Sequence, residues 1–296
     1  MKLISAIRAD KKIVIILILS VIATFLLGRI IINVPEVVQV MSTGKTPVSI
    51  IMYHSILKDS KMAGEFVISP DQFEKDIKFL IDNGYNFITA TELINFVKEK
   101  KYSLPDKPVM ITFDDGYYNN FVYVYPIMEK YDIPFVLSII GYYTDINKDG
   151  DKLSAYYSHV TWDQVREMSE SGLVDIQNHS YNLHKISNAR AGSAKNSNET
   201  VEQYRKFLSE DLTKLQELLK KKSGVKANTF TYPFGKISEE SVDILKELGF
   251  SAALTCHNGI NYIEKGDTEA LYHLKRFNRP HGQSSENFFK GKLEGL

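Results

Sequence analysis

Short apolar segments alternate with helix-like segments along most of this chain, and this order limits the folds open to it. The apolar segments are too short for helices and are predicted to be buried strands at residues 48–53, 108–113, 135–140, 173–177, 229–232 and 251–255. Between them, apolar spacing and capping residues predict helices at 69–84, 91–97, 126–131, 161–172, 199–222 and 238–248. Strands that alternate with helices predict a parallel sheet covered by helices.

Two of these helices allow predictions at the level of single residues. The first is predicted to begin at Ser69, and four residues at helical spacing should form its buried face: Phe73, Ile77, Leu80 and Ile81. In the second, Thr91 is predicted to be the N-terminal cap.

An apolar run at residues 13–28 predicts a membrane-spanning helix, and Arg29 near its end can snorkel, which extends the span to residues 13–34. Basic residues precede the run, and such residues stay on the cytoplasmic side. We therefore expect a single-pass anchor in the cell membrane, with the remaining chain outside the cytoplasm. A cleaved signal peptide is the alternative, but the isoleucines after Arg29 make a poor cleavage site.

The predicted organisation has four parts. Residues 1–12 form a cytoplasmic N-terminus, 13–34 the transmembrane anchor, 35–46 a short linker, and 47–296 one large folded domain. No repeat or low-complexity tract divides the last of these parts.

Charge and cysteine content exclude some functions. The chain has 36 basic and 36 acidic residues, and the first 34 residues carry five basic residues against one acidic residue, a net of +4. The remainder therefore carries about −4, so a nucleic-acid partner is not expected. Cys256 is the single cysteine, which rules out an intramolecular disulfide, and we predict a small buried residue there instead of a nucleophile.

The polar motifs of the large domain each follow a predicted strand. They are His54, the pair Asp114-Asp115, His179 and the turn at residues 233–235. Because the carboxyl ends of parallel strands meet at one face of a sheet or barrel, these residues are predicted to form one functional site.

The segment Thr-Phe-Asp-Asp-Gly at residues 112–116 places two carboxylates side by side at a strand end. Asp114 and Asp115 should repel each other unless a positive group lies near them. Gly116 allows a sharp turn. A solvated turn is the simple alternative, but the position behind a buried strand favours a metal or catalytic role.

His179 and His184 are five residues apart in Asn-His-Ser-Tyr-Asn-Leu-His. That spacing does not place them on one face of a helix, so we expect a loop that folds back. Two imidazoles and one carboxylate of the Asp pair are ligands suited to one divalent metal ion, with Zn²⁺ the first choice and Co²⁺, Ni²⁺ or Mn²⁺ as alternatives. Either histidine alone could equally be a structural residue.

The segment Thr-Tyr-Pro-Phe-Gly at residues 231–235 follows the next strand. One interpretation is an ordinary proline-glycine turn. The functional interpretation is that Tyr232 and Pro233 form a wall of the site and that a backbone N–H there stabilises an oxyanion.

Together and in this order, these three segments resemble the polysaccharide deacetylases of carbohydrate esterase family 4, which contain the NodB-homology domain. The resemblance extends from about Pro47 to Phe289. It implies an α/β fold, a distorted (β/α) barrel, here preceded by the N-terminal transmembrane helix. It also implies that Asp114 is the catalytic base, while Asp115 joins the two histidines as a metal ligand.

The sequence departs from the family pattern in three places. The histidine spacing is one residue longer than usual, the arginine that often precedes the Tyr-Pro segment is absent, and the C-terminal Leu-x-His motif is missing. Residues 51–56, Ile-Met-Tyr-His-Ser-Ile, are similar to the N-terminal Tyr-His of the poly-N-acetylglucosamine deacetylase branch, which implies that His54 is the catalytic acid. Arg276 in Leu-Lys-Arg-Phe resembles that branch's last strand and is a candidate for orienting the base, with a surface position as the alternative.

The resemblance implies metal-dependent hydrolysis of N-acetyl groups on N-acetylglucosamine residues, with release of acetate. The expected substrate is an extracellular or cell-wall polysaccharide, either poly-N-acetylglucosamine or peptidoglycan. In the expected mechanism, Asp114 takes a proton from water and His54, positively charged beforehand, gives one to the leaving amine. The alternatives are a metal-dependent hydrolase of another C–N amide bond and an inactive sugar-binding module.

Overall fold

The computed structural model describes residues 44–147, 152–187 and 190–293. The predicted anchor at 13–34 and nearly all of the linker lie outside these residues. In the part that is described, no helix is both long enough and apolar enough to span a membrane.

The main sheet has nine strands among the described residues, and its core is parallel. Along the sheet, its six central strands are β1 (Thr46–Tyr53), β5 (Pro108–Phe113), β6 (Phe135–Ile139), β7 (Val174–Asn178), β8 (Thr229–Thr231) and β9 (Ala252–Leu254). The three short strands at the margins are β4 (Asn86–Phe87), β10 (Asn261–Ile263) and β11 (Phe277–Asn278). The two strands β2 (Ser55–Ile56) and β3 (Val67–Ile68) form a small separate sheet.

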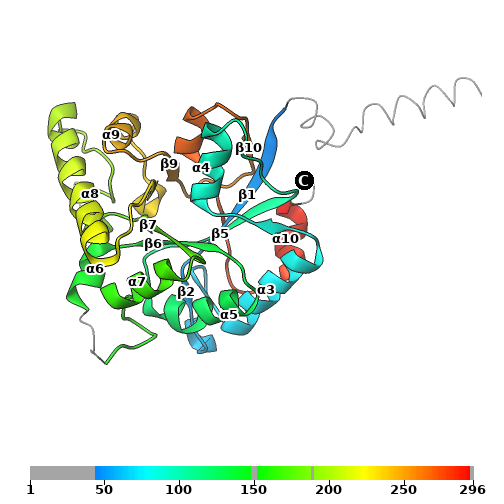
Figure 1. The fold of residues 1–296 in the computed structure, drawn as a ribbon. Coiled ribbons are helices and arrows are strands. Elements are labelled where there is room, and N and C mark those ends of the chain that lie inside the picture. The colour runs from blue at the N-terminus through cyan, green and yellow to red at the C-terminus, as the bar shows by residue number, and fades with distance from the viewer. Residues whose placement is uncertain (1–43, 148–151, 188–189, 294–296) are drawn as a thin grey trace, which may run out of the picture. The chain divides into compact units, whose positions relative to one another are not determined.

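The main sheet curls but does not close. Its hydrogen-bonded path in the described chain runs from β10, which is antiparallel to β1, to β9. Strand β11 pairs with β1 in parallel on the edge opposite β5, because Ile51 pairs with Phe277 on one side and with Ile111 on the other. The expected barrel is therefore a curled half-barrel (Figure 1).

Helices cover both faces of this sheet (Figure 1). In chain order they are α3 (Pro70–Asp82), α4 (Ala90–Lys98), α5 (Tyr125–Lys130), α6 (Gly141–Ile146), α7 (Trp162–Glu170), α8 (Val201–Ser223), α9 (Ser241–Glu247) and α10 (Ser285–Leu293). A π-helical turn (Asn120–Val124) precedes α5, and 3₁₀ turns lie at Ser60–Met62, Pro233–Gly235 and Glu269–His273.

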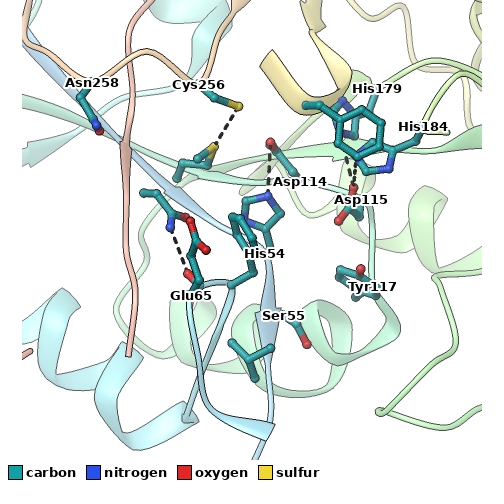
Figure 2. A pocket seen from close by; sticks show the side chains of 15 residues that line it. His54, Ser55, Glu65, Asp114, Asp115, Tyr117, His179, His184, Cys256 and Asn258 are labelled. Carbon is teal, nitrogen blue, oxygen red and sulfur yellow. Dashed lines mark hydrogen bonds and ion pairs between the residues drawn. The ribbon is translucent and has the colours of Figure 1, made fainter. Parts of the chain in front are cut away.

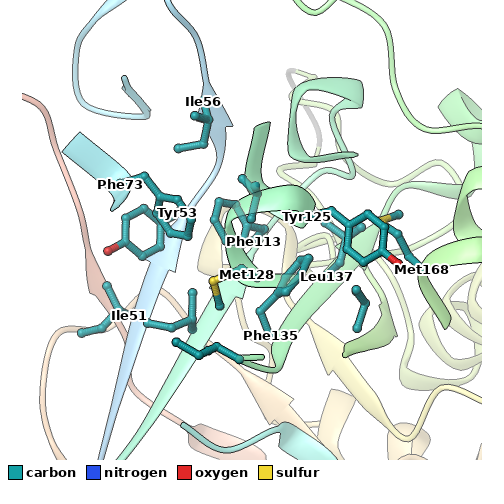
Figure 3. Packing of buried hydrophobic residues seen from close by; sticks show 14 of the residues in the cluster. Ile51, Tyr53, Ile56, Phe73, Phe113, Tyr125, Met128, Phe135, Leu137 and Met168 are labelled. Carbon is teal, nitrogen blue, oxygen red and sulfur yellow. The ribbon is translucent and has the colours of Figure 1, made fainter. Parts of the chain in front are cut away.

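Alternation along β5 explains why its sequence is apolar throughout. Val109, Ile111 and Phe113 pack into one core cluster, which includes residues of α3, α5 and α7. Met110 packs into a second of the three core clusters in the described chain, with residues of α4. Since both faces of the strand are buried, it needs no polar side. Figure 3 shows the first cluster, in which the Phe113 ring stacks on Tyr53 at a centroid distance of 5.2 Å.

The predicted strands and long helices are confirmed, with two local corrections. Thr89, not Thr91, caps α4, because Thr89 and Glu92 exchange side-chain to backbone hydrogen bonds. Thr91 is instead bonded to Asp175 of β7. Ile81 is 39% exposed, so it does not belong to the buried face of α3, which is formed by Phe73, Asp76, Ile77 and Leu80.

A buried ion pair joins α3 to the C-terminal segment. Arg279 donates to both oxygens of Asp76, through Nε at 2.7 Å and Nη2 at 3.0 Å. Tyr53 and Gln72 also donate to the same carboxylate, at 3.2 and 2.9 Å. Four donors therefore satisfy a fully buried charge, which ties the end of β1, helix α3 and the chain after β11 together.

This pair predicts a large stability effect. Arg279→Met leaves the Asp76 charge buried without its partner and should lower the free energy of unfolding by about 3–5 kcal/mol. Adding Asp76→Asn removes the stranded charge while keeping an acceptor for Tyr53, so the double variant should recover part of that loss. Urea unfolding followed by circular dichroism measures both.

The matched control is Lys246→Gln, which breaks an exposed ion pair with Glu269 and should leave the urea midpoint unchanged. Additive losses in the double variant would show that Asp76 and Arg279 do not act as a pair.

Candidate active site

Five of the predicted functional residues meet in one pocket of about 560 Å³ at the carboxyl ends of the parallel strands (Figure 2). His54 follows β1, Asp114 and Asp115 follow β5, and His179 follows β7. The pocket is lined by these residues and by His184. The prediction that the polar motifs share one face is therefore confirmed.

The turn after β5 separates the two carboxylates. Asp115 and Gly116 both have positive φ, 71° and 72°, so the chain reverses immediately after Asp114. A Cβ at Gly116 would lie 2.9 Å from Cγ2 of Ile139, so only glycine fits there without a shift. The left-handed backbone of Asp115 is strained for a non-glycine residue and turns its side chain toward the histidines (Figure 2).

Asp115, His179 and His184 come together as a possible metal site. One ligand atom from each lies within 4.8 Å of the others, and both histidine Nε2 atoms are 3.4 Å from Asp115 Oδ1. This oxygen is buried and accepts no hydrogen bond from the described residues. An orphaned anionic oxygen beside two imidazoles is suited to a divalent cation.

The protein also fixes which nitrogen of His179 faces the site. Its Nδ1 lies 2.8 Å from the carbonyl oxygen of Thr231, which can only accept, so Nδ1 carries the proton. The Nε2 lone pair is therefore free for a metal. Burial alone would lower the pKa of His179, but the carboxylates of Asp115 and Asp114 raise it on balance.

His184 reaches the site through the predicted loop. Asn178 accepts a hydrogen bond from the backbone of Ser180, and Ser180 accepts one from Leu183. Asp211 of α8 accepts two more from the backbone of residues 181–182. These bonds fold the chain back so that two histidines five residues apart converge.

Asp114 is held apart from the possible metal site. Arg276 donates two parallel hydrogen bonds of 2.7 Å to the two oxygens of the Asp114 carboxylate. Arg276 also donates to the Thr255 carbonyl. Arg276 is 0% exposed, so its alternative placement at the surface is wrong. Burial would raise the pKa of Asp114, but the guanidinium holds it below its ordinary value, and Asp114 stays ionised.

His54 completes the opposite side of the pocket. Its Nε2 lies 3.9 Å from Asp114 Oδ2, and its Nδ1 is buried without a hydrogen-bond partner in the described chain. Burial lowers the pKa of His54, and the attraction of Asp114 and Asp115 does not restore it. The ring is therefore neutral near pH 7, which corrects the expectation that it is charged beforehand.

Tyr232 and Pro233 do not have the predicted geometry. Tyr232 is fully buried, its hydroxyl is bonded to Ser241, and its N–H donates to the Leu254 carbonyl at 3.0 Å. Pro233 has no N–H. The pocket wall after β8 is instead Phe234, whose ring lies 4.2 Å from that of His184. Neither residue named for the oxyanion thus has a free backbone donor.

Several pocket residues were not predicted. Tyr117 lines the pocket beside Asp115, and burial together with that carboxylate raises its pKa. Its position two residues after the Asp pair was a usable signal. Phe66, Asn258 and Asn278 also line the pocket, but they stand in no motif. Cys256 is half-buried in the pocket wall, not buried as expected.

An ionised carboxylate kept separate from a possible metal triad, at the carboxyl edge of a parallel sheet, is typical of a metal-assisted hydrolase. A sequence profile described as "Polysaccharide deacetylase" matches residues 101–253, which are 153 of the 296 residues. The chain therefore belongs to the polysaccharide deacetylase family. The predicted NodB-type α/β fold is confirmed, with an open half-barrel in place of a barrel.

Curated relatives share about a quarter of their residues with this chain. A poly-beta-1,6-N-acetyl-D-glucosamine N-deacetylase of Escherichia coli (strain K12) is 27% identical over 228 residues, 71% of this chain and 34% of that protein. The chain thus spans about a third of that relative's length. A protein of the same name from Staphylococcus aureus (strain N315) is 26% identical over 190 residues, 64% of this chain and 61% of that protein.

Two solved structures are similar in fold and sequence. A de-N-acetylase from Aggregatibacter actinomycetemcomitans has a TM-score of 0.69 and 27% identity, and the match covers 85% of this chain and 100% of that one. IcaB from Ammonifex degensii has a TM-score of 0.65 and 26% identity over 79% and 92% of the two chains.

The geometry predicts which residues bind metal. Asp115→Ala and His184→Ala each remove a predicted ligand and should weaken Zn²⁺ binding by more than roughly 100-fold. Loss of a residue that only orients a ligand already weakens metal binding by roughly 10- to 100-fold, so loss of a ligand itself should cost more. Isothermal titration of chelator-treated protein measures this. Asp114→Asn is the matched control and should bind within a few-fold of wild type, because Arg276 holds that side chain away. Equal losses in all three variants would contradict the division between the two carboxylates.

Proposed function

We propose that this protein is a metal-dependent polysaccharide N-deacetylase that acts on poly-N-acetylglucosamine and releases acetate. The observation that carries the proposal is the separation of two adjacent carboxylates: Asp115 faces two histidines, while Arg276 holds Asp114 toward His54. Membership in the polysaccharide deacetylase family supports the reaction type. The names of the relatives support the polymer.

A divalent metal held by Asp115, His179 and His184 would lower the pKa of water and polarise the acetyl carbonyl. Asp114 is ionised and faces the same pocket, so it takes the proton from water as water attacks the amide carbon. Arg276 fixes the direction of the carboxylate and keeps it a proton acceptor and not a ligand.

His54 handles the proton at the leaving nitrogen. Because it is neutral before reaction, it must first gain a proton, and Asp114 Oδ2 is 3.9 Å from its Nε2. We infer that the proton taken from water reaches the sugar amine through these two atoms. The C–N bond then breaks, giving acetate and a free amine on the polymer.

The location is also a proposal. An anchor at residues 13–34 with the remaining chain outside the cytoplasm would place residues 47–296 beside exported and cell-wall polysaccharides. Peptidoglycan is the competing polymer under this arrangement.

Acetate release tests the function directly. The chain should release acetate from β-1,6-linked N-acetylglucosamine oligomers, lose this activity with a chelator, and regain it with added Zn²⁺, Co²⁺, Ni²⁺ or Mn²⁺. Asp114→Asn should lower kcat by roughly 10²–10⁴-fold, the contribution typical of a general base. Release from peptidoglycan alone would reassign the polymer, and oligomer binding without any release would indicate an inactive sugar-binding module.

The Arg276–Asp114 pair predicts a change in pH dependence. Arg276 lowers the pKa of Asp114, and a base works only when ionised, so activity should persist at acidic pH in the wild type. Arg276→Met removes the positive charge, the pKa of Asp114 rises, and the acidic limb of the kcat/KM profile should move to higher pH. Arg276→Lys keeps a charge and should move it less. An unmoved acidic limb in Arg276→Met would mean that Asp114 is not the base.

A further inference from the structure

Two phenylalanine rings are exposed at the pocket, one beside His54 and the other beside His184. Phe66 is 48% exposed and Phe234 is 36% exposed. Of the large apolar side chains exposed in the described chain, these two line the pocket. A single exposed apolar residue needs no explanation, but a pair that flanks one site is typical of a surface that a ligand covers.

Phe66 is fixed relative to His54. Its ring contacts the His54 ring edge to face, with centroids 4.8 Å apart and planes at 63°. The Phe66 carbonyl accepts a hydrogen bond from the backbone of Ser55 at 3.1 Å, and Asn278 donates to the neighbouring Glu65 carbonyl at 3.0 Å. The exposed ring is therefore positioned by two strands and by the C-terminal segment.

Phe234 is held in place at the cost of backbone strain. Its φ of 58° and ψ of 13° lie in the left-handed region, which a phenylalanine rarely adopts. Gly235 also has positive φ, and a Cβ there would lie 2.6 Å from Cβ of Cys256. This tight turn puts the ring 4.2 Å from that of His184 while leaving it exposed. Strain that holds an apolar ring at a site points to a role for the ring.

A pyranose sugar matches this arrangement chemically. Its C–H faces are apolar and stack on aromatic rings, while its hydroxyl rim needs polar partners. The pocket offers such partners in Ser55, Asn258 and Asn278, and its volume is in the usual range for small ligands. The scissile nitrogen is bonded directly to the sugar ring. When His54 protonates this nitrogen, the sugar must therefore lie beside Phe66, whose ring contacts that of His54.

We propose that Phe66 and Phe234 are specificity-determining residues that hold an N-acetylhexosamine ring between them by stacking on its apolar faces. Phe66 contacts the sugar that carries the acetamide, and Phe234 contacts the side nearer His184. This inference rests on the proposed function, because it takes the polymer from there.

The test separates sugar binding from chemistry. Phe66→Ala, Phe66→Leu and Phe234→Ala should each raise KM for a β-1,6-linked N-acetylglucosamine oligomer by roughly three- to tenfold, with kcat changed less. Phe66→Tyr and Phe234→Tyr keep a ring face and should stay near the wild type. On an aryl acetate that lacks a sugar, KM should be the same in all variants. Tyr157→Ala is the control, since Tyr157 is 75% exposed but does not line the pocket.

Oligomer binding by calorimetry provides a second readout that does not need turnover. In the Asp114→Asn background, the Ala and Leu substitutions should weaken binding by the same factor as they raise KM. If acetate release fails but these losses appear, the proposed function is wrong and the sugar contact stands. If release proceeds while KM and binding are unchanged, or if the aryl acetate is affected equally, the stacking role is wrong. Thermal unfolding of each variant verifies that the fold is retained.

Discussion

The buried pair between Arg276 and Asp114 is the contact on which the site depends. Two charges removed from water are tolerated only when each satisfies the other, and here the guanidinium meets both carboxylate oxygens at 2.7 Å. Arg276 immediately precedes β11 and Asp114 immediately follows β5, and β1 lies between these two strands. The pair therefore connects the two strands across β1. It also keeps Asp114 ionised and separate from the possible metal site of Asp115, His179 and His184. Without it, two adjacent carboxylates would lie at one strand end with no positive side chain paired to Asp114.

A second arginine extends this arrangement to the other side of the pocket. Arg279, three residues after Arg276, satisfies Asp76, which also accepts from Tyr53 immediately before His54. Between them, Asn278 reaches the loop that carries Phe66. The C-terminal segment thus fixes both Asp114 and the surroundings of His54. Residues more than 160 positions apart form one unit, so the site is complete only after the final strand has joined β1.

The sequence was sufficient where chemistry followed local order. The strand ends, the Asp-Asp-Gly turn and the returning histidine loop all lie where predicted, although the loop also takes two hydrogen bonds from Asp211 of α8. Tyr232 failed because burial and the Leu254 carbonyl, neither visible in a local motif, took its N–H. The prediction that His54 is positively charged failed for a similar reason. Burial lowers the pKa of His54 by more than the nearby carboxylates raise it. Phe66 and Asn278 reach the pocket only through tertiary pairing, which no spacing rule encodes.

Strained backbone lies close to the carboxylate oxygen of Asp115 that has no hydrogen-bond partner among the described residues. Among the described residues, three of the five non-glycine residues with positive φ belong to this site: Asp115, Ser180 and Phe234. Asp115 Oδ1 is also buried without a donor. Each feature disfavours the folded state unless something compensates, and the buried ion pairs and the packed core do so here. Hydrogen bonds already hold His179 and the loop that carries His184 in place. A cation that binds there would therefore gain contacts without having to order these side chains first.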